Sequence, residues 1–79
     1  MCSVCADQKS AIGQVLRAKR EKLGISQEEL AEHAGVDRTY VSSLERGLKS
    51  PTLETFERIC TALGTLPESV LKEARKRQD

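Results

Sequence analysis

Apolar side chains recur along this chain at intervals of three and four positions, which is the spacing of one face of an α-helix. Short segments that contain glycine or proline separate these stretches. Since glycine commonly ends a helix and proline disfavours helix in the residue before it, each such segment marks a boundary. The pattern predicts five short helices, at residues 10–23, 26–34, 37–46, 52–63 and 67–77. No stretch has the alternation of a strand, so we predict a compact all-α domain.

Residues that favour a helix start stand before these stretches. The predicted N-caps are Ser10, Ser26, Asp37 and Thr52. Ser26 and Glu29 have the spacing of a capping box, in which each side chain accepts a hydrogen bond from the backbone amide of the other residue. Pro67 fits the first turn of the last helix. Residues 1–9 have no periodicity and no good cap, so we predict a flexible arm there, followed by one domain at residues 10–79.

The apolar faces of the five helices are expected to form the core. Their residues are Ile12, Val15, Leu16 and Leu23, then Leu30, Ala31 and Ala34, then Val41 and Leu44, then Leu53, Phe56, Ile59, Cys60 and Leu63, and finally Leu66, Val70, Leu71 and Ala74. Aromatic residues make up only 3% of the chain, so this core must be largely aliphatic.

The stretch QEELAEHAGVDRTYVSSLER, residues 27–46, predicts two helices that meet at a steep angle, because very few residues join them. Such a crossing needs a small residue at the contact and a residue that tolerates positive φ in the turn, and Ala31 and Gly35 meet these needs. The apolar anchors on the two sides are Leu30, Val36, Val41 and Leu44. An ordinary helical hairpin shares each single feature, but the combination favours a helix-turn-helix.

Length and composition exclude several classes of protein. A chain of 79 residues has room for one small core. Its 13 Lys and Arg and 12 Asp and Glu give a formal net charge of +1, so total charge indicates no partner. No apolar run approaches the ~18 residues of a membrane-spanning helix, and the start MCSVCADQKS lacks the layout of a secretory signal. We expect a cytoplasmic protein with no membrane partner.

The stretch LRAKREKLGISQEELAEHAGVDRTYVSSLERGLKSPTLETFERICTALG resembles the phage-repressor and Cro-like, or XRE-type, helix-turn-helix family. It follows the family's order R-x-x-R/K-x-x-x-G-x-S/T-Q-x-x-L-A, then G-V, S-x-x-E-x-G and P-x-x-x-x-x-x-x-I, and the resemblance extends over about residues 10–74. The segment DRTYVSSLERG is most similar to the controller proteins of restriction-modification systems, which are small dimeric regulators made of this domain alone. The resemblance implies a lambda-repressor-like fold with the helix-turn-helix in the second and third helices. It also implies a transcriptional regulator that binds a (pseudo)palindromic double-stranded DNA operator as a homodimer, with the third helix in the major groove.

Four residues of the third helix are candidates to read bases, since the first turn of such a helix reaches base edges. The Arg38 fork can bond O6 and N7 of guanine together. Thr39 offers a hydroxyl and a methyl group, and Tyr40 a phenol that can reach a phosphate or pack on a thymine methyl. Ser43 lies on the same side, one turn after Thr39. The alternatives are a solvated arginine, a tyrosine packed on the fold and a surface serine.

The candidates for phosphate contacts are Gln27, Ser42, Arg46 and Lys49. Gln27 stands at the amino end of the second helix, where backbone amides attract an anion, and it matches the family's phosphate-clamping glutamine. Arg46 and Lys49 follow the third helix and can contact phosphates across the groove, unless they are merely solvated. Between residues 38 and 49 the only acid is Glu45, so we expect a locally basic face with the acids of the second helix behind it.

The resemblance further implies a structural ion pair between Arg20 and Glu45, which ties the first helix to the end of the third. Dimerisation would double the length of the DNA site, with recognition helices ~34 Å apart. The last helix has more apolar residues than its outer position in a five-helix core needs. The candidates for the dimer interface are therefore Leu63, Leu66, Val70 and Leu71. The alternative is that they all close the core of one copy.

Cys2, Cys5, Cys60 and His33 could together offer four metal ligands. A structural zinc site normally has two close ligand pairs, whereas this chain has one pair and two isolated residues, so we expect no metal and no cofactor. An odd number of cysteines without an export signal argues against a disulfide framework. A redox role for Cys2 and Cys5 stays open.

The sequence offers no arrangement typical of an enzyme, since it has no grouped nucleophile, base and orienting residue and no Gly-rich phosphate loop. The competing interpretation is an antitoxin-type or phage or mobile-element repressor whose helix-turn-helix also binds a protein partner. Such a protein would have the same helices. Activation of transcription would add RNA polymerase as a partner, and the sequence identifies no surface for it.

Overall fold

The computed structural model describes the backbone of residues 3–78 and the side chains of residues 11–76. This part of the chain forms five α-helices and no strand. The helices are α1 (Ser3–Leu23), α2 (Gln27–Ala34), α3 (Arg38–Glu45), α4 (Leu53–Ala62) and α5 (Pro67–Gln78). None of them combines the length and the apolar character needed to cross a bilayer. The predicted all-α class and the five helices are confirmed.

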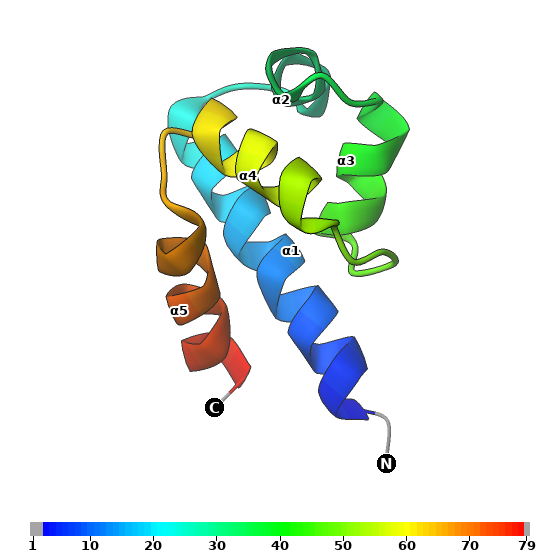
Figure 1. Cartoon of the computed structure of the whole chain (residues 1–79), viewed down its shortest axis with the longest axis vertical. Helices are drawn as coiled ribbons and strands as arrows, with labels where there is room; N and C mark the ends of the chain where they lie inside the picture. Colours follow the sequence, from blue (N-terminus) through cyan, green and yellow to red (C-terminus); the bar gives the residue numbers. More distant parts are fainter. Residues whose placement is uncertain (1–2, 79) are drawn as a thin grey trace.

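The long helix α1 runs most of the length of the molecule, with α5 and α3 packed directly against it (Figure 1). α5 lies beside α1, α3 packs against α1 on another side, and α2 contacts both α3 and α4. The start of α1 and the end of α5 lie at one end of the molecule, and α2 lies at the other (Figure 1). Within the predicted helix-turn-helix, α2 is therefore far from both ends of the described chain, and α3 runs from α2 back along α1.

Apolar side chains from all five helices and from the residue after α4 meet in one core. They are Ala11, Val15, Leu16, Leu30, Ala31, Ala34, Val41, Leu44, Phe56, Ile59, Cys60, Leu63, Val70 and Ala74. Full burial of one large aliphatic side chain contributes about 1.5–3 kcal/mol, whereas helices of eight to twelve residues, such as α2 to α5, are marginal on their own. Burial in this core, rather than intrinsic propensity, therefore holds the short helices.

The start of α1 differs from the prediction. The helix begins at Ser3 rather than at Ser10, so Ser10 lies inside it and is not its N-cap. No glycine or proline stands between residues 3 and 10, so nothing in that segment stops the helix from extending towards its amino end. The predicted boundary between an arm at residues 1–9 and the domain therefore does not coincide with a helix start. Met1 and Cys2 lie outside the described residues.

Capping at the next helices follows the sequence more closely. The capping box of α2 is complete, because the Glu29 amide donates to Ser26 Oγ at 3.0 Å and the Ser26 amide donates to Glu29 Oε1 at 2.8 Å. Thr52 accepts from the Thr55 amide at the start of α4. Asp37 occupies the N-cap position of α3, but its side chain makes no capping hydrogen bond.

Four leucines predicted to face the core are exposed instead. Their exposed fractions are 53% for Leu23, 74% for Leu53, 61% for Leu66 and 46% for Leu71. Leu23 is the last residue of α1, Leu53 the first of α4, and Leu66 precedes α5. At these three helix ends the side chain is left uncovered, so a periodicity that holds within the helix does not ensure burial there.

Gly13 marks the closest approach of α1 to α3. A Cβ atom at this position would collide with the backbone oxygen of Leu44 and would lie 2.8 Å from that of Glu45. Backbone atoms cannot move aside as the end of a side chain can, so any larger residue would push the two helices apart. The absence of a side chain here thus fixes how α3 sits on the long helix.

Candidate nucleic-acid interface

α2 and α3 form a helix-turn-helix with a very short turn. Gly35 ends α2 with φ at +73°, a conformation that L side chains rarely adopt. The Val36 amide donates to the Ala31 oxygen at 2.9 Å, which folds the chain back over the end of α2. α3 then begins at Arg38, and it runs in the plane of Figure 1 while α2 is seen end-on. This steep crossing is the one predicted from the sequence.

The two sides of α3 differ in chemistry. Val41, Leu44 and Glu45 are buried against the rest of the domain. The opposite side has no large apolar residue, and the predicted DNA-contacting side chains gather on it. Thr39 and Arg46 are exposed there, and Ser42 and Ser43 are half-buried. Arg38 is also exposed, but it lies at the edge of this side, next to α2. The structure therefore brings four of the predicted contact residues onto one polar side of α3, with Arg38 beside them.

Tyr40 lies at the edge of this polar side rather than on it. The side chain is half-buried and packs against the hydrophobic core. The ammonium of Lys49, from the segment between α3 and α4, lies 5.5 Å from the centre of the Tyr40 ring. Sequence reasoning did not find this contact, because the two residues are nine positions apart and meet only after the chain turns at the end of α3.

The ion pair between Arg20 and Glu45 is present and largely buried. Arg20 Nε donates to Glu45 Oε2 at 2.8 Å, and Arg20 Nη2 donates to Glu45 Oε1 at 3.2 Å. The side chains are only 12% and 3% exposed. The third nitrogen, Arg20 Nη1, donates to the Ile25 oxygen at 2.8 Å. The hydrogen bond with Glu45 raises the pKa of Arg20 above its ordinary value, and burial opposes this only in part.

Gln27 belongs to the same network, which the sequence did not indicate. Its amide nitrogen donates to Glu45 Oε1 at 3.0 Å. The single carboxylate of Glu45 thus joins α1, the start of α2 and the end of α3. An amide nitrogen carries two hydrogens, and one N–H of Gln27 is used by Glu45. The position predicted for a phosphate clamp is therefore held in place by the structural ion pair.

Acidic residues lie closer to Arg38 than the sequence indicated. One hollow between α2 and the start of α3 is lined by Glu28, Glu29, Ala31, Glu32, Val36, Asp37 and Arg38. The sequence indicated a locally basic face with these acids behind it, and the structure adds that they border Arg38 directly. The short turn brings the first turn of α3 back beside α2, so Arg38 presents its charge in an acidic surrounding. Carboxylates in such a position would repel a phosphate brought close to Arg38.

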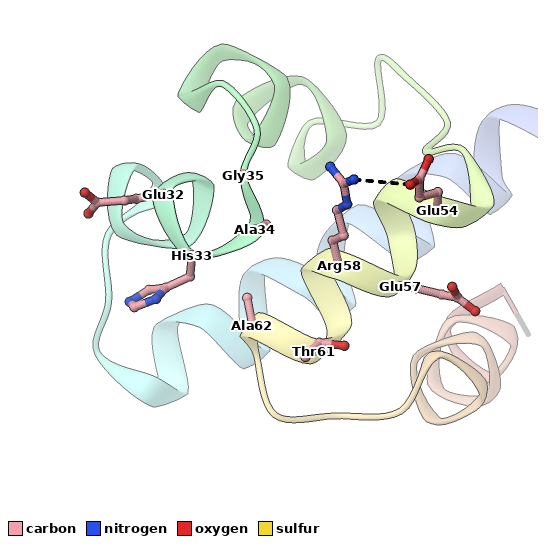
Figure 2. Close-up of a pocket in the computed structure, with 9 residues that line it drawn as sticks. All are labelled: Glu32, His33, Ala34, Gly35, Glu54, Glu57, Arg58, Thr61 and Ala62. Carbon is pink, nitrogen blue, oxygen red and sulfur yellow. Dashed lines mark hydrogen bonds and ion pairs between the residues drawn. The ribbon is translucent and has the colours of Figure 1, made fainter.

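A second hollow lies between α2 and α4 (Figure 2). Its lining residues are Glu32, His33, Ala34, Gly35, Glu54, Glu57, Arg58, Thr61 and Ala62. Arg58 is paired with Glu54 at 3.2 Å, and the carboxylates outnumber the cations. A phosphate backbone would be repelled here, so this hollow does not belong to the candidate interface.

The structure separates the two described residues of the possible metal-ligand set, Cys60 and His33. Cys60 is fully buried in the core, whereas His33 is exposed at the second hollow. Burial raises the pKa of the Cys60 thiol to about 11, so it behaves as a small apolar side chain. Among the described residues no three His, Cys, Asp or Glu side chains are grouped as metal ligands. Cys2 and the side chain of Cys5 lie outside the described part.

The predicted dimer residues divide into two pairs. Leu63 and Val70 are 6% and 0% exposed, so they are core residues and cannot form a surface for a second copy. Leu66 and Leu71 are exposed. Leu71 lines an apolar hollow with Ile12, Ser50, Pro51, Leu53 and Phe56. Successive residues of a helix point in directions about 100° apart, so Val70 faces the core while its neighbour Leu71 faces the surface.

Comparison with known proteins agrees with this architecture. Residues 16–70 match the family model described as Helix-turn-helix (HTH_3). The chain is 42% identical over 60 residues to the control protein C.BamHI of Bacillus amyloliquefaciens, which covers 75% of this chain and 74% of that protein. The structure is similar to that of the clp gene regulator ClgR from Corynebacterium glutamicum, with a TM-score of 0.87, 38% identity and coverage of 91% and 92%.

It is also similar to the restriction-modification controller protein C.Esp1396I, whose tetramer has been solved in complex with its natural 35 base-pair operator. This second likeness has a TM-score of 0.80 at 28% identity, and it covers 90% of this chain and 93% of the other. The match of the family model extends over more than half of the chain and includes the whole helix-turn-helix. The chain belongs to the XRE-type Helix-turn-helix family of transcriptional regulators.

Proposed function

We propose that this protein regulates transcription as the controller protein of a restriction-modification system, and that it reads its operator with α3 in the major groove. The observation that carries the proposal is the polar side of α3, with Arg38 and Thr39 exposed at its start and Arg46 exposed at its end. The likeness to the control protein C.BamHI and to C.Esp1396I supports the controller role.

The side chains take different roles in this proposal. Arg38, Thr39 and Ser43 contact base edges, because Arg38 is exposed at the first position of α3 and Thr39 and Ser43 lie on the polar side within its first two turns. Gln27, Ser42, Arg46 and Lys49 contact phosphates on the two sides of the groove. The buried pair of Arg20 and Glu45 touches no DNA, and it fixes the angle at which α3 leaves the domain.

Selection of duplexes from a randomised pool tests this function, and the salt dependence of binding tests the phosphate contacts. Arg46 and Lys49 in two copies provide four cations, so the slope of log K against log salt is expected to be about −3.6, at about 0.9 for each neutralised phosphate. Lys49→Gln removes one cation from each copy and should reduce the slope to about −1.8. Failure to enrich any sequence, or binding that does not depend on salt, would contradict the proposal.

The proposed regulator acts as a homodimer through the apolar face around Leu53, Leu66 and Leu71. These side chains are largely exposed in one copy, and Leu71 and Leu53 line one apolar hollow. One recognition helix reads only a few base pairs, so a second copy related by two-fold symmetry is needed to lengthen the site.

Leu71→Glu is expected to convert the dimer to a monomer and to leave the fold intact, because this side chain is 46% exposed within one copy. Sedimentation velocity at several concentrations measures the change. Leu23→Glu is the matched control, since Leu23 is similarly exposed but lies at the far end of α1. A wild-type chain that stays monomeric at high concentration would refute dimerisation, and an equal effect of both substitutions would place the interface elsewhere.

A further inference from the structure

Lys49 and Tyr40 are the one cation and aromatic ring found in contact within the described part of the chain. Lys49 Nζ lies 5.5 Å from the centre of the Tyr40 ring, inside the range of a cation–π interaction. No ion pair is found for Lys49 among the described residues. Among the described residues the ammonium therefore rests on the face of an aromatic ring, and its opposite side is open to solvent.

The backbone explains why a residue beyond α3 reaches back to Tyr40. The Gly47 amide donates to the Leu44 oxygen at 3.1 Å, and the Leu48 amide donates to the Ser43 oxygen at 2.9 Å. With Gly47 at a φ of +75°, these two bonds form a Schellman closure that folds the chain over the last turn of the helix. Lys49 follows at once, so its stem starts beside α3 rather than in a free loop.

The ring itself is held in place. Tyr40 is half-buried and packs on the core, whereas Lys49 is exposed. A flexible lysine loses rotamer freedom when it binds a phosphate, and this loss weakens binding. A lysine that already rests on a rigid ring loses less. An ammonium over a ring also keeps hydrogen-bond donors available for a phosphate. It carries three N–H donors, and those that point away from the ring have no acceptor in the ring.

We propose that Tyr40 is a positioning residue, whose ring holds the Lys49 ammonium beside α3 so that Lys49 meets a DNA phosphate with little further ordering. This inference rests on the proposed DNA-binding function, and it assigns to the Tyr40 ring a role separate from any contact of its hydroxyl group. An exposed cation–π contact corresponds to about two- to fivefold in affinity.

The contact itself is tested in the free protein by NMR. The εCH₂ protons of Lys49 are expected to shift upfield in the wild-type chain because of the ring current. They should stay shifted in Tyr40→Phe, which keeps a ring, and return to ordinary values in Tyr40→Leu. A wild-type spectrum without the upfield shift would overturn the proposal, and this holds even where Tyr40→Leu fails to fold.

The positioning role is tested by how much Lys49→Gln weakens binding to the duplex enriched by selection. This loss of affinity, called the cost of Lys49→Gln below, is measured in three backgrounds. This cost is expected to be the same in the wild-type and Tyr40→Phe backgrounds, and about two- to fivefold smaller in Tyr40→Leu. If Tyr40 had a purely structural role, Tyr40→Leu would lower the melting temperature but would leave the cost of Lys49→Gln unchanged.

The outcomes separate this inference from the function on which it rests. An equal cost of Lys49→Gln in all three backgrounds, with sequence-specific binding intact, would overturn the positioning role alone. Loss of the coupling in Tyr40→Phe would also overturn it, because the hydroxyl and not the ring would then be responsible. A wild-type chain that prefers no duplex would overturn the proposed function and the positioning role together.

Discussion

Replacement of Glu45 by alanine is expected to lower the free energy of unfolding by about 3–5 kcal/mol, the largest effect on stability of any single substitution considered for this chain. The Glu45 side chain is 3% exposed and accepts hydrogen bonds from both Arg20 and Gln27. Its removal would leave the Arg20 guanidinium, itself only 12% exposed, without its charged partner. For a domain of this size such a loss corresponds to a fall of at least about 12 °C in melting temperature.

The exposed pair of Arg17 and Glu21 provides a matched control for this experiment. These residues also form a glutamate–arginine pair, at 3.2 Å, but their side chains are 63% and 56% exposed. Glu21→Ala is therefore expected to change stability by less than about 1 kcal/mol. Thermal melts followed by circular dichroism compare the two variants. If Glu45→Ala melts like the wild-type chain, the buried pair has no structural role.

A second measurement separates stability from recognition. At a temperature where Glu45→Ala is still folded, its preference for the selected duplex over a scrambled one should match that of the wild-type chain. The reason is that Glu45 lies on the buried side of α3, where no base can reach it. A changed preference in the folded variant would assign Glu45 to recognition instead.

Replacement of Arg38 by alanine is expected to have the largest effect on sequence preference. The guanidinium is exposed at the first position of α3, and its fork matches the O6 and N7 acceptors of guanine. Loss of this contact should weaken binding to the selected duplex by about 1–3 kcal/mol in each half-site, which is about 5- to 150-fold. Titration of selected and scrambled duplexes at one salt concentration measures it, and stability should change by less than about 0.5 kcal/mol.

Arg46→Ala is the control that distinguishes base reading from charge. Arg46 is also an exposed arginine on the polar side of α3, but it lies at the far end of the helix. Its removal should weaken binding to selected and scrambled duplexes alike, because a phosphate contact carries no sequence information. If Arg38→Ala also weakened both duplexes equally, Arg38 would be a phosphate contact and would not read bases.

The carboxylates around Arg38 are also expected to affect which duplexes the protein prefers. Glu28, Glu32 and Asp37 line the same hollow as the arginine. A carboxylate close to a phosphate raises the free energy of any protein–DNA complex. The increase is expected to matter most on a wrong sequence, where no hydrogen bond from Arg38 to a base offsets it. We therefore expect the selectivity of α3 to depend on repulsion from α2 as well as on attraction by Arg38.

The sequence predicted much of this fold because the relevant signals are local. The capping box of Ser26 and Glu29 involves residues three positions apart, and the turn at Gly35 needs only a residue that tolerates positive φ. The exposed face of α3 follows from 3.6 residues per turn once the buried face is known. The start of α1 was predicted at Ser10 from a candidate cap, but residues 3–10 contain neither a glycine nor a proline that would stop the helix, and it begins at Ser3.

The candidate dimer surface shows where periodicity alone fails. Apolar character made Leu63, Leu66, Val70 and Leu71 equal candidates, but two are core residues and two are exposed. The difference depends on which side of α5 meets α1 and on where each helix ends, and both are properties of packing. Likewise, no sequence pattern around Gly13 indicates that a side chain is forbidden there. Only the close approach of α1 to α3 shows that this position must lack a Cβ atom.

The sequence by itself determined the five helices, most of their boundaries and the family of the helix-turn-helix, since these depend on residues within a few positions of one another. Only the tertiary structure decided that one carboxylate, Glu45, joins Arg20 and Gln27, and that Lys49 rests on Tyr40. Partners that are 25, 18 and 9 residues apart meet through the crossing angles of helices and the closure of their ends. These angles follow from how whole side chains fill a shared core, and no short segment of sequence contains that information.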